Sequence, residues 1–126
     1  MRSLVLAFVS MIGVFGAIAF LHASAQGTNT AQVARGRYLV TQAGKCSDCH
    51  GPQLQGAALD FLKPGLPVLY AAPKIAGLPG LSVPAATKFL ETGLLPTGKP
   101  ARPPMPQFRF NPDDAASIAA YLKSLH

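Results

Sequence analysis

The pentapeptide Cys46-Ser47-Asp48-Cys49-His50, a C-x-x-C-H motif, constrains this chain more than any other feature of its sequence. Its two cysteines are three positions apart, so one helical turn places both sulfurs on the same face, where two haem vinyl groups can be reached. His50 follows directly, and its imidazole can then ligate the iron. The motif therefore predicts covalent attachment of a c-type haem through Cys46 and Cys49, with His50 as an iron ligand.

A second candidate ligand lies downstream, in Arg102-Pro103-Pro104-Met105-Pro106. Met105 is the only methionine outside the N-terminal segment. A thioether opposite a histidine gives the ligation that raises the potential of electron-transfer haems. Met105 could instead be an apolar plug in a proline-rich loop, since methionine commonly fills gaps. We expect one haem, with His50 and Met105 as its axial ligands.

Three other chemistries use the same cysteines. A thiol–disulfide enzyme should carry the C-x-x-C near a βαβ pattern, and the sequence shows no convincing run of strands. A structural zinc site needs four ligands, and the only histidine beyond the cluster and the N-terminal segment is His126. A structural disulfide suits an oxidising compartment. None of these alternatives gives a role to both His50 and Met105, whereas a haem does, which favours the haem.

The N-terminus resembles an export signal. Arg2 supplies a positive charge, Leu4 to Leu21 is uncharged and largely apolar, and Ala23-Ser24-Ala25 is a small-x-small cleavage site. We expect residues 1–25 to be a signal peptide and residues 26–126 the mature domain, located in the bacterial periplasm, where haem is attached after export. The apolar run is just long enough to span a bilayer, so an uncleaved membrane anchor is the alternative.

The charge of the chain points to protein partners. The formal net charge is +6, and the basic residues are scattered along the sequence. A nucleic-acid binder shows clustered basic runs instead, so we expect no nucleic-acid partner. A modestly basic exported domain suits docking to an acidic protein. We expect membrane contact only if the N-terminal segment is uncleaved.

The sequence predicts helices separated by irregular chain. Capping and stop residues indicate a helix over about 31–43 and a second over Pro84 to Thr92, with Ser82 or Val83 as its cap and Gly93 as its end. The clearest helix is the last, with Asn111 as N-cap and Pro112 at its first position. We expect a turn at 45–50 and loops over 51–81 and 94–108.

These motifs, in this order, resemble the class I monohaem cytochromes c over nearly all of residues 30–126. Gly36-Arg37-Tyr38-Leu39 resembles the family's N-terminal helix, which crosses a C-terminal helix represented here by Ala120-Tyr121-Leu122. The resemblance implies that Gly36 lets the two helices approach closely, with Tyr38 and Tyr121 packing nearby. Pro104-Met105-Pro106 is similar to the family's methionine loop.

The resemblance extends to a supporting residue. Ala72-Pro73-Lys74-Ile75-Ala76-Gly77-Leu78 resembles a segment whose proline carbonyl accepts a hydrogen bond from the ligand histidine and orients its ring. By this likeness Pro73 would hold His50 and belong to the haem site. The interval from Gly36 to Cys46 is two residues longer than in the shortest members, so we expect the helix before the haem to be longer or bulged.

The resemblance implies an all-α small cytochrome c fold, with three or more helices and long loops around one covalent haem. It implies an electron carrier rather than an enzyme, which could also be the cytochrome subunit of an oxidoreductase complex. The stretches "GRYL…CSDCHG" and "PPMPQFRF…IAAYL" look like haem domains that serve bacterial periplasmic dehydrogenases. Its redox partner would be such a dehydrogenase, a reductase or a terminal oxidase.

Three roles stay open. The chain can be a soluble shuttle, a subunit held stably in a periplasmic dehydrogenase complex, or a haem-based sensor or peroxidase-like protein. A fixed subunit should show a large apolar surface patch, which the segment from Leu59 to Leu81 could supply. A sensor needs Met105 to leave the iron readily.

Overall fold

The structure, a computed structural model, describes residues 29–125. The chain divides into two units, residues 1–31 and 32–126. Of the first unit only residues 29–31 are described, and they are helical. The expected signal peptide over 1–25 lies outside the described residues, as does His126. Within the described part, no helix has the length and apolar character needed to cross a bilayer.

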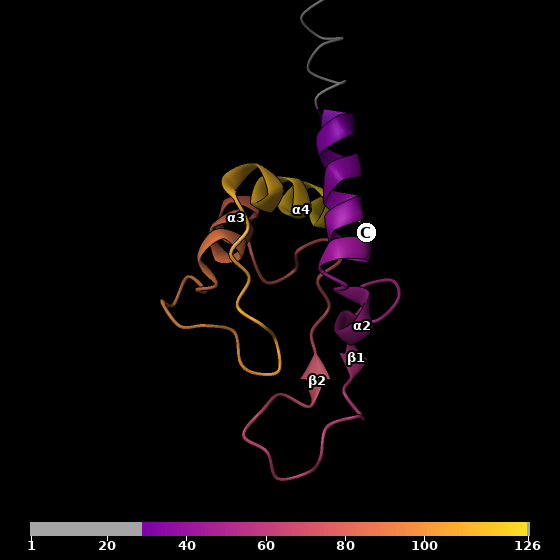
Figure 1. The fold of residues 1–126 in the computed structure, drawn as a ribbon, viewed down its shortest axis with the longest axis vertical. Helices are drawn as coiled ribbons and strands as arrows, with labels where there is room; N and C mark the ends of the chain where they lie inside the picture. Colours follow the sequence, from indigo (N-terminus) through magenta and orange to yellow (C-terminus); the bar gives the residue numbers. More distant parts are fainter. Residues whose placement is uncertain (1–28, 126) are drawn as a thin grey trace, which may run out of the picture. The chain divides into compact units, whose positions relative to one another are not determined.

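The first helix of the second unit ends in a widened turn. Residues 32–38 are α-helical and continue as the π-helix η1, Leu39–Ala43 (Figure 1). In η1 the Gly44 N–H donates to Leu39 O at 2.7 Å, and the Cys46 N–H donates to Val40 O at 3.0 Å. A π-turn holds more residues than an α-turn. The expected bulge before the haem motif is therefore confirmed.

Helix α4, Pro112–Ser124, begins as its sequence predicts. The Asn111 side chain accepts the Asp114 N–H at 2.9 Å, which satisfies one of the free donors of the first turn. Asp113 and Asp114 place negative charge at the positive end of the helix dipole. Arg35 adds an ion pair across the two helices, with Nε 2.8 Å from Asp114 Oδ1. This pair holds the pKa of Asp114 below its ordinary value.

The first helix and α4 cross at Gly36 (Figure 1). A Cβ atom at Gly36 would collide with Ser117 O and would lie only 2.7 Å from Tyr121 Cβ. The close approach expected of this glycine is confirmed. The expectation that Tyr38 packs beside the crossing is wrong, because Tyr38 is 54% exposed and its ring lies under the Arg35 guanidinium. Leu39 occupies the inward face instead.

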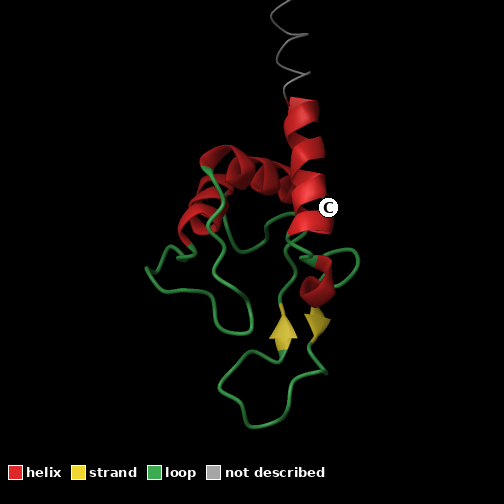
Figure 2. Ribbon diagram, in the orientation of Figure 1, coloured by secondary structure: helices red, strands yellow, loops and turns green. Residues whose placement is uncertain are grey.

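Helix α3, Val83–Thr92, packs against α4 (Figure 2). Its N-cap is Ser82, whose hydroxyl accepts the Ala85 N–H, and it ends at Gly93 in a left-handed conformation. The predicted bounds were right to within one residue. The core between the helices is apolar and consists of Leu39, Val40, Leu54, Ala76, Leu90, Ala115, Ile118 and Leu122.

One short two-stranded sheet interrupts residues 51–81, the segment expected to be loop. Strand β1, Ala57–Ala58, pairs antiparallel with β2, Ala71–Ala72, with Ala57 opposite Ala72 (Figure 2). Two alanines carry no alternation of apolar and polar residues, so the sequence held no strand signal. The sheet closes a loop over residues 59–70, and the described chain is otherwise helices and loops, as expected.

Candidate functional site

The C-x-x-C-H motif forms a single helical turn, α2, Ser47–His50. The His50 N–H donates to Cys46 O at 2.9 Å, and the Cys49 N–H donates to the same oxygen at 3.3 Å. This turn carries both cysteines on one side, because residues three apart on a helix are neighbours. Both are free thiols and partly buried. Burial raises the pKa of the Cys46 thiol.

His50 has one ring nitrogen held and one ring nitrogen available. The residue is 6% exposed, and its Nδ1 lies 2.7 Å from Pro73 O. A carbonyl oxygen only accepts, so Nδ1 carries the proton and donates it, which leaves Nε2 with a free lone pair. Within the described part of the chain, Nε2 makes no hydrogen bond. This is the tautomer that an iron ligand requires, and the ring is held by the contact expected of Pro73.

The segment that carries Pro73 is held on both sides. Leu54 O accepts the N–H groups of Ile75 and Ala76 at 2.9 and 3.1 Å, and the Gly77 N–H donates to Leu122 O of α4 at 2.8 Å. Four long-range hydrogen bonds, counting the one from His50, therefore fix the backbone around Pro73. The position of the His50 ring follows from that rigidity.

Gly56 is a site residue that the sequence reasoning missed. Its N–H donates to His50 O at 2.8 Å. Its φ is +91°, and a Cβ atom there would lie 2.9 Å from both Ala72 O and Lys74 N. Only glycine lets the chain after the motif lie this close to the Pro73 peptide. The sequence around Gly56 gave no signal for this role, because the rule that an isolated glycine marks close backbone approach applies within a strand pattern, and none is present.

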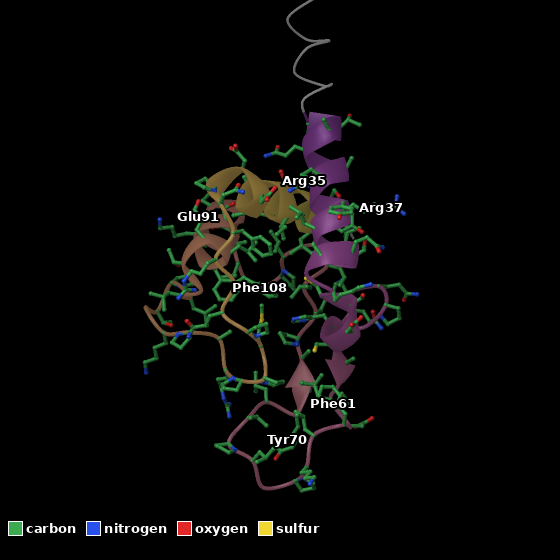
Figure 3. All side chains as sticks on the ribbon, viewed as in Figure 1. Arg35, Arg37, Phe61, Tyr70, Glu91 and Phe108 are labelled. Atoms are coloured by element: carbon green, nitrogen blue, oxygen red, sulfur yellow. The ribbon has the colours of Figure 1, made fainter. Side chains whose placement is uncertain are left out.

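Met105 is partly buried and lies on a separate loop over residues 94–108, which we call the methionine loop. Its N–H donates to Arg102 O at 3.4 Å. Within the loop the Leu95 N–H donates to Lys99 O, and just after it the Phe110 N–H donates to Leu90 O of α3. The rings of Phe108, labelled in Figure 3, and Phe110 stack with centroids 5.2 Å apart. The structure thus brings Cys46, Cys49, His50 and Pro73 together and leaves Met105 on a neighbouring loop.

One hydrogen bond connects the two regions. The Leu69 N–H donates to Pro103 O at 2.8 Å, and Leu69 stands just before β2, which leads to Pro73. In Figure 1 the loop between α3 and α4 runs beside β2, in agreement with this bond. The chain on either side of β2 therefore contacts the methionine loop at one end and His50 at the other.

The donors present suit a haem better than the alternatives. Among residues 29–125, no three His, Cys, Asp or Glu side chains gather into a metal site, so a zinc ion would lack protein ligands there. Two thiols on one turn beside a buried histidine with a free Nε2 match what covalent haem attachment needs. The alternative of a thiol–disulfide enzyme lacks its βαβ unit in the described chain.

Comparison with known proteins agrees with the site. The family model described as cytochrome c matches residues 33–126. No curated protein and no solved structure matches the chain. Members of this family bind haem c covalently and transfer electrons, and the helical domain built around Cys46, Cys49 and His50 is compatible with their small fold. This chain belongs to the cytochrome c family.

Proposed function

We propose that this protein is an electron carrier of the bacterial periplasm, with a single haem c whose iron His50 and Met105 would ligate. The observation that carries the proposal is the His50 ring, buried and oriented by Pro73 with Nε2 left free. When bound, the haem supplies an iron that alternates between Fe(III) and Fe(II). Cys46 and Cys49 would hold the group covalently, and His50, whose ring is oriented by Pro73, would ligate its iron.

Met105 is the residue proposed as the second iron ligand. Its support is chemical, because it is the only thioether outside the N-terminal segment, and structural, because its loop is tied to Leu69 and the chain just after the loop is tied to Leu90. A thioether stabilises Fe(II) and raises the potential. Two protein ligands also leave no open position for a substrate, which suits a carrier without a reaction of its own.

The periplasmic location rests on the N-terminus. Arg2, the apolar run from Leu4 to Leu21 and the Ala23-Ser24-Ala25 site support export and cleavage before Gln26. Covalent attachment of haem at C-x-x-C-H takes place after export in bacteria, so the two features agree. If the segment is retained, the same domain is anchored to the membrane and faces the same compartment.

An optical experiment tests the proposal. The haem-loaded protein, oxidised and reduced, should give a low-spin spectrum with the weak near-infrared charge-transfer band of methionine on Fe(III). Met105→Ala should abolish this band and lower the potential, because the thioether is lost. Gln107→Ala, a neutral change on an exposed residue of the same loop, serves as the control and should keep the band.

Two results would overturn the assignment. If the band survives in Met105→Ala, another group is the sixth ligand. A high-spin spectrum of the unmodified protein, or binding of carbon monoxide to its reduced form at neutral pH, would indicate an iron that opens readily and would move the function to ligand sensing or peroxidase-like chemistry.

A stable subunit of a periplasmic dehydrogenase is the second candidate, favoured by one surface feature. Phe61 is 67% exposed and Leu66 is 48% exposed, and both lie on the loop over residues 59–70, where Figure 3 labels Phe61. These two exposed apolar side chains on one loop are the observation that favours an interaction surface there. Co-purification of a dehydrogenase with the wild-type protein, lost in Phe61→Ser, would support the subunit. Elution of the wild-type protein as a lone chain would favour the shuttle.

A further inference from the structure

A short stretch of backbone contacts both proposed ligand loops. At residue 69 its N–H donates to Pro103 O at 2.8 Å, two positions before Met105. At residue 73 its carbonyl accepts the His50 Nδ1–H at 2.7 Å. Strand β2 lies between these two points and is paired with β1. We call residues 69–73 the connecting segment. Its placement affects His50 and the methionine loop together.

The Tyr70 hydroxyl fixes the start of this segment. It accepts the Leu66 N–H at 2.7 Å, and its single proton is shared between Lys63 O at 3.0 Å and Leu66 O at 3.1 Å. The Tyr70 carbonyl accepts the Leu59 N–H at 2.8 Å. One side chain thus closes the loop over residues 59–70 onto its own base, where Figure 3 labels Tyr70.

Tyr70 contributes little to the core. It is 40% exposed. The described loop that it closes has few other internal hydrogen bonds, namely Leu62 N–H to Leu59 O and Val68 N–H to Leu66 O. Without the hydroxyl, the Leu66 N–H loses its partner, and residues 63–66 lose the contact that holds them against the end of the loop at Tyr70.

We propose that Tyr70 is a positioning residue for the sixth ligand. By closing the loop, its hydroxyl holds Leu69 where the N–H reaches Pro103, and this bond holds the methionine loop in place. Removing the hydroxyl raises the fraction of molecules in which Met105 is off the iron. The inference rests on the proposed ligation by Met105.

The test is displacement of methionine by an added ligand. Imidazole is titrated into the oxidised, haem-loaded protein, and the loss of the methionine charge-transfer band is followed. The apparent affinity is the intrinsic affinity multiplied by the open fraction. Tyr70→Phe removes both the hydrogen bond that the hydroxyl accepts and the one that it donates. Transmission of the contribution of one neutral hydrogen bond to the methionine loop predicts roughly threefold to tenfold tighter apparent binding. Tyr38→Phe is the control, because its exposed hydroxyl makes no hydrogen bond within the described chain.

A double variant separates this inference from the proposed function. In a Met105→Ala background the Tyr70→Phe change should no longer alter imidazole affinity, because there is no methionine to displace. If Met105→Ala itself leaves the band and the affinity unchanged, the proposed ligation is wrong. If Met105→Ala acts as expected while Tyr70→Phe matches wild type, the ligation stands and the role of Tyr70 is overturned. A purely structural role would lower the denaturation midpoint without changing the affinity.

Amide exchange in the unmodified protein gives a second test that needs no variant. Displacing Met105 with imidazole should speed exchange at the Leu69 amide, whose acceptor Pro103 O moves with the methionine loop. The Gly77 amide, bonded to Leu122 O of α4, should keep its rate. Equal rates at Leu69 with and without imidazole would overturn the coupling between the two segments.

Discussion

Replacing Gly36 with alanine places a methyl group where the first helix meets α4. The added Cβ would collide with Ser117 O, lie 2.6 Å from Ser117 C and lie 2.7 Å from Tyr121 Cβ. Two of these three atoms belong to the α4 backbone, so no rotation of a side chain relieves the contact. The helices must therefore move apart, and the packing around Val40 and Ile118 loosens with them.

The size of the effect follows from two opposing contributions. Alanine is about 1 kcal/mol more favourable than glycine in a helix, which stabilises the variant. Overpacking against rigid neighbours costs about 1–3 kcal/mol, and a backbone collision lies at the upper end of that range. The net expectation is a loss of about 2 kcal/mol in the free energy of unfolding, from about 3 lost and about 1 gained. For a domain of this size that corresponds to a fall of roughly 8–16 °C in Tm.

The assay is denaturant unfolding of the haem-loaded protein, followed by haem absorbance and far-ultraviolet circular dichroism, with the slope checked for two-state behaviour. Gly80→Ala is the matched control, because no atom lies within 4 Å of a Cβ there. It should be neutral or slightly stabilising through the unfolded chain. If Gly36→Ala and Gly80→Ala unfold alike, the two helices do not cross at Gly36 and the reasoning fails.

Two further outcomes are expected. Changing Cys46 and Cys49 together to alanine should leave any haem extractable by acidified organic solvent, and retention of haem after extraction would contradict covalent attachment. Arg35→Gln should flatten the acid side of the curve of stability against pH. The hydrogen bond from Arg35 lowers the pKa of Asp114 in the folded protein. The pair therefore stabilises the fold fully at pH values above the pKa of an unfolded Asp, about 3.9. That contribution is lost as the pH falls through the lower pKa of the folded protein. The change should be small, because Arg35 is exposed. An unaltered acid limb in urea titrations from pH 2 to 6 would show that the pair does not form.

The features predicted best from sequence were those decided by neighbouring residues. Asn111 followed by Pro112 starts α4 as predicted, and the bounds of α3 follow from Ser82 and Gly93. An N-cap side chain accepts a free backbone N–H of the first turn, and a glycine in the left-handed conformation ends the last turn. Both effects act within one turn of the helix. The C-x-x-C-H turn is of the same kind, because its spacing places both cysteines on one side of α2.

The errors and omissions came from contacts between residues far apart in the chain. Two alanine pairs form a two-stranded antiparallel sheet because hydrogen bonds align them across a loop. No sequence pattern within either pair predicts it. Tyr38 was expected to pack beside the helix crossing, yet it is 54% exposed. Gly56 stood in no strand pattern that would have marked it as a point of close backbone approach.

The sequence by itself determined the chemistry of this protein: two thiols, one histidine after them and one thioether downstream are groups suited to bind one haem. Only the tertiary structure decided how the histidine is held, since Pro73 reaches Nδ1 from 23 positions away. It also decided why Gly36 must be glycine and what restrains the methionine loop. The physical reason is that ligand identity is a property of single side chains, whereas ligand geometry depends on backbone segments that meet only after the loops between them have closed.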